Sequence, residues 1–224
     1  FTPGWRKYLA SEVKKVVDIP VIAANLIRSP KQAEMQLEEG TQDFISLGRP
    51  LIADPNWPNK VKSGNENLIK RCVCCLYCFE SMMKGAYKYT HGNCSVNPFV
   101  GRENVSLKQN GNGRKVLIIG AGCAGLTAAE LLSKRGFDVT VLEKESKQGG
   151  QLNLASKPPH KEKINWVCED LLSNAINSGA KVLFDIKADK NIIASYSPEI
   201  VITATGGNAI HPKSFNGDNV VTVT

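Results

Sequence analysis

With 224 residues, the chain is long enough for one large domain or two small ones. Its composition, 42% hydrophobic and 22% charged, is that of an ordinary globular protein, and no apolar run is long enough to cross a bilayer. The net charge of +7 comes from scattered lysines rather than a basic run with interleaved aromatics, which argues against a nucleic-acid partner. We therefore expect a cytoplasmic protein without a membrane partner.

Residues 1–64 alternate between helical and strand patterns. The expected elements are a helix (Trp5–Val17), a strand (Val21–Ala24), a helix from Ser29 to Gly40, a strand (Asp43–Leu47) and a helix near Asp54. Ser29 is a good N-cap and Pro30 a good first helical residue. Two βα units of this kind fit either a doubly wound sheet or the end of a β/α barrel, and periodicity cannot choose between them.

Residues 65–113 show no regular periodicity and end in a polar, glycine-rich linker. Alternation returns in residues 114–224. The expected elements are strand Lys115–Ile119, helix Ala124–Arg135, strand Asp138–Leu142, a helix near Lys161–Ser178, and strands near Lys181–Phe184, Glu199–Ala204 and Asn219–Thr224. The first three form a βαβ unit. Because the chain starts with Phe1 and its terminal strand has no stop signal after it, we expect a piece of a longer protein.

Most of the seven cysteines crowd into one short segment, which favours metal ligation in a reducing compartment over disulfides. The spacing Cys72-x2-Cys75-x2-Cys78, with Cys94 further along, suits a [4Fe–4S] cluster. A tetrahedral zinc site with four thiolates is the alternative, and unligated thiols are a third interpretation. The side chain of Cys74 is expected to point away from its neighbours and to ligate nothing.

A glycine-rich loop, Gly120-Ala-Gly-Cys-Ala-Gly125, follows a predicted strand and opens a predicted helix. In this context the pattern indicates a dinucleotide site: Gly120 makes the tight turn, Gly122 admits the pyrophosphate, and Gly125 lets helix and strand pack closely. The phosphates would lie at the helix N-terminus, where free N–H groups favour anions. Glu143 would accept hydrogen bonds from the adenosine ribose. A glycine turn without a ligand is the alternative.

The combined motifs resemble the iron–sulfur flavoprotein branch of the old yellow enzyme family. Its members include bacterial 2,4-dienoyl-CoA reductase, trimethylamine dehydrogenase, and the enoate and bile-acid enoate reductases of anaerobes. The matching segments follow the family's order along nearly the whole chain: Leu47–Pro55, Ile69–Cys78, Cys94–Glu103, the glycine-rich loop, Gly149–Asn153, Lys157–Pro159 and Ile202–Gly207.

The resemblance implies an α/β fold in three parts. Residues 1–64 would be the last βα units of an FMN-binding TIM barrel, with Gly48 and Arg49 at the flavin phosphate. For Arg49, an ordinary surface charge is the alternative. Residues 65–113 would hold the cluster, and residues 114–224 would form a Rossmann-like domain that binds FAD, or only ADP. Further contacts with that dinucleotide would come from Gly150, Gln151, Thr205 and Gly206.

The resemblance also implies an NAD(P)H-dependent flavin oxidoreductase. Electrons would pass from NAD(P)H through FAD and the cluster to FMN, which would reduce the activated C=C bond of an enoate or dienoyl thioester. An amine dehydrogenase that sends electrons outward is one alternative, and the cysteine spacing resembles the trimethylamine dehydrogenase type. An electron-transfer module without turnover of its own is another.

The family's substrate-protonating residues would lie upstream of Phe1, so we assign no catalytic residue and expect the chain alone to be inactive. The partners expected are a small-molecule substrate and further copies of the same chain.

Overall fold

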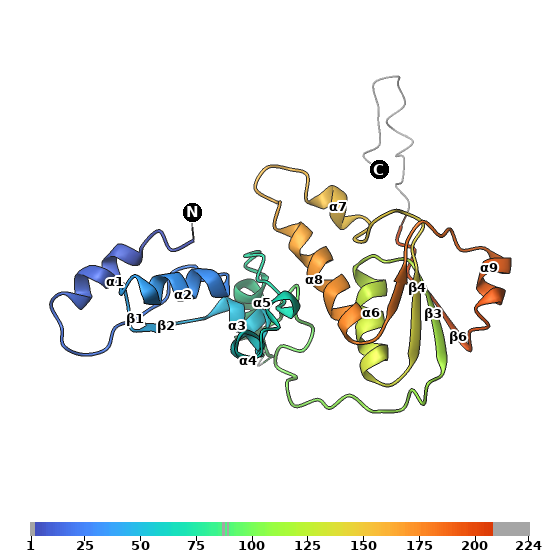
Figure 1. The fold of residues 1–224 in the computed structure, drawn as a ribbon, viewed down its shortest axis with the longest axis horizontal. Coiled ribbons are helices and arrows are strands. Elements are labelled where there is room, and N and C mark those ends of the chain that lie inside the picture. The colour runs from blue at the N-terminus through green and yellow to red at the C-terminus, as the bar shows by residue number, and fades with distance from the viewer. Residues whose placement is uncertain (1–2, 87, 89, 208–224) are drawn as a thin grey trace, which may run out of the picture. The chain divides into compact units, whose positions relative to one another are not determined.

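The computed structural model describes residues 3–86, 88 and 90–207. The chain divides into two compact units, residues 1–105 and 106–224, and each contains parallel strands with helices (Figure 1). The α/β fold with parallel sheets is thus confirmed. The cysteine segment belongs to the first unit, and the three-part division expected from the sequence stays a prediction. The expected strand Asn219–Thr224 lies outside the described residues.

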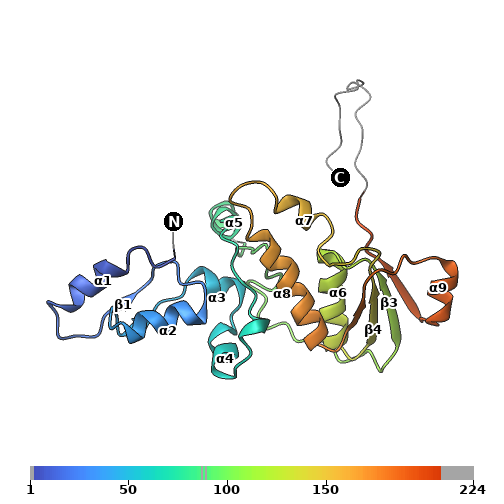
Figure 2. The same cartoon turned by 45° about the horizontal axis from the view of Figure 1, so that its top comes forward.

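The first unit has two short parallel strands with helices beside them (Figure 2). Its elements are α1 (Lys7–Lys14), β1 (Ile22–Ala23), α2 (Pro30–Glu38), β2 (Phe44–Ile45), α3 (Arg49–Ala53), α4 (Trp57–Lys62), the 3-10 helix η1 (Glu66–Leu68) and α5 (Tyr77–Ala86). The start of α2 is as expected: the Gln32 amide donates to Ser29 Oγ at 3.2 Å, and Pro30 follows the cap.

Packing in the first unit is uneven. Ile27, Ala33, Trp57 and Ile69 form a small buried cluster that joins the α2 region to α4 and the start of the cysteine segment. The strands contribute little to a core, because Ile22 and Phe44 face each other in register and are 65% and 56% exposed. The pair of strands therefore carries an apolar surface that is open to solvent.

Two helices of the first unit differ from the prediction. The helix expected near Asp54 begins at Trp57, and the shorter α3 precedes it. α5 lies within the segment that was expected to be irregular. Its apolar residues, including Phe79 and Met83, are exposed.

The second unit contains a four-stranded parallel sheet in the order β5-β4-β3-β6. Its elements are β3 (Lys115–Ile119), α6 (Cys123–Lys134), β4 (Asp138–Leu142), α7 (Leu152–Ala155), α8 (Ile164–Asn177), β5 (Lys181–Leu183), α9 (Lys190–Ser195) and β6 (Ile200–Thr203). α6 and α8 lie side by side against the sheet, and α9 lies away from them (Figure 1). Strands β3 and β4 have the predicted bounds, whereas α7 and α9 were not predicted.

The core of the second unit lies between the sheet and its helices. Ile118, Leu126 and Val141 are completely buried, one each from β3, α6 and β4. The strand order also creates a switch point, because the chain leaves β3 toward β4 and later returns to the other side of β3 as β6. In open parallel sheets, ligands bind outside the carboxyl ends of the strands at such a point.

None of the helices in the described part of the chain is long and apolar enough to cross a membrane.

Candidate functional site

The glycine-rich loop connects β3 to α6 at the switch point, and its glycines are tightly constrained. Gly120 has φ +109°, which L side chains rarely adopt, and an added Cβ would lie 2.5 Å from the Ala204 carbonyl oxygen. A Cβ at Gly125 would lie 1.9 Å from the Gly120 carbonyl oxygen, so helix and loop can approach only without a side chain there. Gly122 instead faces open space. These environments are compatible with the roles expected for the three glycines, and their contacts with a dinucleotide stay predictions.

Glu143 directly follows β4 and is only 7% exposed. Its Oε2 accepts a hydrogen bond from the Ala121 amide at 2.7 Å, and its Oε1 accepts one from the Glu145 amide at 3.0 Å. Each carboxylate oxygen can accept a second hydrogen bond, so a ribose contact is compatible with both. The carboxylate also holds the glycine loop, which the sequence did not reveal, and its ribose role stays a prediction.

A second loop, at the start of α7, lies against the glycine loop. The Gly149 amide donates to the Ala121 carbonyl oxygen at 2.9 Å, and an added Cβ at Gly150 would lie 3.7 Å from the Gly122 Cα. Gln151 Nε2 donates to the Gly207 carbonyl oxygen at 2.9 Å. Gly150 and Gln151, both predicted cofactor contacts, thus border the open face of the glycine loop.

A third loop follows β6 and contains the predicted contacts Thr205 and Gly206. It is fixed beside β3, because the Ala204 amide donates to the Ile119 carbonyl oxygen at 2.8 Å. Three loops therefore meet at the carboxyl edge of the sheet. Free N–H groups at the start of the 12-residue helix α6 would favour the pyrophosphate of a dinucleotide there.

The cysteine segment of the first unit has an unusual backbone. Cys74 and Leu76 have φ of +58° and +61°, a left-handed conformation that non-glycine residues seldom adopt. α5 begins directly after these turns, so Cys78 lies in its first turn, while Cys72 and Cys75 precede it. Three of the four predicted ligands therefore lie on one short stretch that contains two left-handed residues.

The predicted ligands lie on two arms. The first arm carries Cys72, Cys75 and Cys78 and continues into α5, and the second, around Cys94, is attached to it. Ser81 Oγ donates to the Asn93 carbonyl oxygen at 3.2 Å and accepts from the Asn93 amide at 2.7 Å. Cys75 Sγ lies 3.2 Å from Ser95 Oγ. Residues on both sides of Cys94 therefore contact the segment that carries the other three thiols.

The thiols form no disulfide, and no group of three or more metal-ligating side chains is assembled among the described residues. The donor set nevertheless suits an iron–sulfur cluster, because four thiols lie on two arms that contact each other. A ligating arrangement would require these side chains to turn toward one centre. The assignment of Cys72, Cys75, Cys78 and Cys94 as ligands remains a prediction.

Cys74 corrects one expectation. Its side chain does not point away from its neighbours, because Cys74 Sγ donates to the Cys72 carbonyl oxygen at 3.8 Å. The two thiols interact as well: hydrogen bonding to Cys74 raises the pKa of Cys72, burial raises it further, and the charge of Arg49 opposes both. The left-handed φ of Cys74 places its side chain beside Cys72, which the spacing rule did not anticipate.

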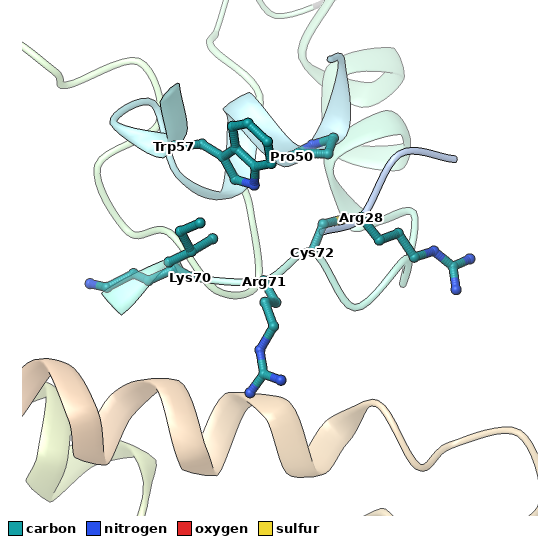
Figure 3. A pocket seen from close by; sticks show the side chains of 7 residues that line it. Arg28, Pro50, Trp57, Lys70, Arg71 and Cys72 are labelled. Carbon is teal, nitrogen blue, oxygen red and sulfur yellow. The ribbon is translucent and has the colours of Figure 1, made fainter. Parts of the chain in front are cut away.

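Residues from several segments line a small pocket that includes Cys72. A small pocket of about 10 Å³ is lined by Arg28, Pro50, Trp57, Ile69, Lys70, Arg71 and Cys72 (Figure 3). Its volume suits about one water molecule and not a flavin. Trp57 is buried, and neither its Nε1 nor the Nε of Arg28 has a hydrogen-bond partner. No local pattern marks this group in the sequence, because Arg28, Pro50 and Trp57 are far along the chain from the run that ends at Cys72.

Gly48 and Arg49, the predicted flavin-phosphate residues, stand where β2 gives way to α3. Gly48 is the N-cap position and Arg49 the first residue of that helix. An electrostatic interaction links Arg49 to Cys72, so the predicted flavin-phosphate residue and the first predicted cluster ligand are neighbours.

The parallel sheet and its glycine loop define an α/β protein of the dinucleotide-binding class. Residues 118–194 match the NAD(P)-binding Rossmann-like domain, and residues 4–67 match the NADH:flavin oxidoreductase / NADH oxidase family. The chain belongs to this family, which is old yellow enzyme-like.

Two curated relatives and one solved structure illustrate the similarity. NADH oxidase from Thermoanaerobacter brockii is 43% identical, over 95% of this chain and 33% of its own. Cinnamate reductase from Clostridium sporogenes is 33% identical, over 88% of this chain and 29% of its own. The structure of 2-naphthoyl-CoA reductase with 2-naphthoyl-CoA matches with a TM-score of 0.86 and 31% identity, over 95% of this chain and 32% of its own. The chain thus spans about a third of these proteins.

Proposed function

We propose that the protein containing this chain is an NAD(P)H-dependent flavin oxidoreductase that reduces an activated C=C bond. The observation that carries the proposal is the combination, in one chain of this family, of a two-armed cysteine segment and a glycine loop at a sheet switch point. The names of two similar proteins point to an unsaturated carboxylate or thioester as the substrate.

In this proposal the chain carries parts of three cofactor sites. Cys72, Cys75, Cys78 and Cys94 hold a [4Fe–4S] cluster. The loops around Gly120, Gly150 and Thr205 hold FAD, or only ADP, with the pyrophosphate at the N-terminus of α6. When bound, the cluster and flavins supply one-electron and hydride transfer. The chain's own residues bind and orient these groups, and the charge of Arg49 offsets part of the negative charge that a thiolate at Cys72 brings.

The first unit would contribute the end of an FMN-binding barrel. Residues 4–67 match the flavin oxidoreductase family, and β1 and β2 pair in parallel as neighbouring barrel strands do. Gly48 and Arg49 follow the second of these strands, at the carboxyl end where barrel enzymes bind their cofactors. Their contact with the FMN phosphate, and a cytoplasmic location, are part of the proposal.

The decisive experiment uses the full-length protein, purified without oxygen. Iron, acid-labile sulfide and both flavins should be present, and cinnamate or an enoyl-CoA should accelerate NADH or NADPH oxidation. A matched Cys75→Ser variant should keep FAD and its reduction by the nicotinamide but lose substrate reduction. Turnover that is equal in both proteins would contradict the electron path through the cluster.

An amine dehydrogenase is a second candidate, because the Cys72-x2-Cys75-x2-Cys78 spacing resembles the trimethylamine dehydrogenase type. The same preparation decides between the two. In an enzyme of that kind, a methylated amine alone would bleach the visible absorption of the bound cofactors, and the reduced enzyme would pass electrons to an artificial acceptor. In a C=C reductase, NADH or NADPH would bleach this absorption, and the enoate would restore it.

A further inference from the structure

Helix α3 contacts the arm that carries Cys94. Asn97, three residues after Cys94, is 7% exposed, and its Nδ2 donates to the Ile52 carbonyl oxygen of α3 at 2.8 Å. Its Oδ1 accepts a hydrogen bond from the Phe99 amide at 3.0 Å. One side chain therefore fixes the turn after Cys94 and attaches that turn to α3.

The other arm is attached at the C-terminal end of the same helix. Asp54 is 4% exposed, and its Oδ2 accepts from the Lys70 amide at 2.9 Å, two residues before Cys72. Lys60 Nζ lies 2.6 Å from the same oxygen and also donates to the Leu68 carbonyl oxygen at 2.6 Å. A buried, charged network thus fixes the backbone that leads into the first arm, at Leu68 and Lys70.

Both arms of the cysteine segment are therefore tied to one five-residue helix, and that helix begins with Arg49. We propose that α3 is a brace in which Asn97 and Asp54 are positioning residues: they set the distance between the two arms of the cluster site, and between that site and Arg49. The inference rests on the proposed function for the identity of the bound groups.

The proposal has a physical basis in how metal sites are held. Thiolate-bearing loops are flexible unless backbone contacts order them, and groups beyond the direct ligands set ligand orientation and metal retention. The contacts of Asn97 and Asp54 are buried, so removing them leaves unsatisfied polar groups. Asn97 is the sharper test, because loss of the Asp54 network would leave Lys60 without its carboxylate and disturb the fold.

The test compares Asn97→Asp with Asn93→Asp in the full-length protein. Asn97→Asp keeps an oxygen that can accept from Phe99 but replaces the donor to Ile52 with a second oxygen. Asn93 is exposed, lies in the same arm, and its backbone makes the Ser81 contacts. Asn93→Asp therefore adds the same charge without altering the brace.

Three readouts separate positioning from folding. Asn97→Asp should retain iron against a competing chelator roughly ten- to hundred-fold less tightly than the wild type, the usual cost in metal affinity when groups behind metal ligands are altered. The electron paramagnetic resonance signal of the reduced cluster should change in shape, while the far-UV spectrum stays the same. Asn93→Asp should match the wild type in each respect. Equal iron loss and equal spectra in both variants would overturn the brace.

A metal-free readout keeps this result separate from the proposed function. In apo-protein, Asn97→Asp should raise hydrogen exchange in residues 92–99 and speed the alkylation of Cys94, and Asn93→Asp should not. If the wild type holds no iron, the proposed cluster is wrong, and the exchange data still decide whether α3 orders this arm. Unchanged exchange and alkylation in Asn97→Asp overturn the brace.

Discussion

The carboxylate of Glu143 accepts a hydrogen bond from the Ala121 amide at 2.7 Å, so the residue after β4 holds the glycine loop that follows β3. The contact is buried and joins neighbouring strands at the switch point of the sheet. It places a fixed negative charge beside the predicted adenosine site. Such a charge disfavours a 2′-phosphate and suits a ribose with free hydroxyls.

Replacing Glu143 with alanine should weaken the binding of FAD or ADP. The variant loses the predicted ribose contact and frees the Ala121 amide, and a hydrogen bond to a charged group contributes about 1.5–3 kcal/mol. The dissociation constant should rise by roughly ten- to hundred-fold, as measured by calorimetric titration. Glu145→Gln is the control, because that side chain is exposed and lies 3.4 Å from Lys144 Nζ, away from the glycine loop. Equal affinities in all three proteins would place the site elsewhere.

The loop glycines should separate folding from binding. Gly125→Ala puts a Cβ 1.9 Å from the Gly120 carbonyl oxygen, so it should lower the free energy of unfolding by about 1–3 kcal/mol, as overpacking does. Gly122→Val meets open space in the protein, so stability should hold while dinucleotide binding is lost. Thermal unfolding and an ADP titration measure the two effects. A Gly122 variant that binds ADP normally would contradict the expected approach of the pyrophosphate.

Cys75→Ser should abolish the cluster, and Cys74→Ser should retain it. Both residues lie in the same turn, and only Cys75 follows the ligand spacing. Because Cys74 contacts Cys72, its serine variant should alter the surroundings of the cluster without removing a ligand. Iron and sulfide analysis after anaerobic purification provides the measurement. Equal loss of iron in both variants would mean that the ligand set is different, and stoichiometric zinc without sulfide would mean that the metal is zinc.

The strands and the glycine loop of the second unit were largely predictable, because their signals are local. β3 and β4 have apolar runs of strand length, and the loop glycines report backbone conformations that depend on few neighbours. The roles of Ala121 and Gly149 could not be predicted. Their contacts join segments that the chain separates by more than twenty residues, and a single sequence holds no record of such pairs.

For the cysteine segment, the ligand set stays a prediction, and the local structure was not predicted. The spacing rule singled out four thiols as ligands, but it said nothing of α5, which begins directly after the left-handed residues Cys74 and Leu76. The attachments at Asp54 and Asn97 were missed for another reason. A buried aspartate or asparagine in a loop resembles an ordinary turn residue until its tertiary partner is known.

Acid should weaken the first unit through Asp43. Its carboxylate lies 2.6 Å from Lys14 Nζ and accepts a hydrogen bond from the Val21 amide at 2.8 Å. Both contacts lower the pKa of Asp43 below the ordinary value of 3.8, and the contact with Lys14 has the larger effect. A lowered pKa in the folded state contributes stability above pH 3.8, which is lost as the pH falls through the folded value. Asp43→Asn should therefore have a lower melting temperature than the wild type at pH 6, and the difference between the two melting temperatures should be smaller at pH 3. A constant gap in thermal unfolding would contradict this linkage.

The 224-residue chain alone should not reduce an enoate or a dienoyl thioester. Within the described residues β1 and β2 pair only with each other, whereas a closed β/α barrel needs about eight strands. The exposed Ile22 and Phe44 side chains lie on this strand pair, so FMN would meet Arg49 without an enclosing site. The isolated chain should therefore retain FAD or ADP in preference to FMN. Anaerobic assay with NADH, both flavins and cinnamate measures the activity, with the full-length protein as the positive control. Cinnamate-dependent NADH oxidation above a protein-free control would show that the catalytic groups lie within this chain.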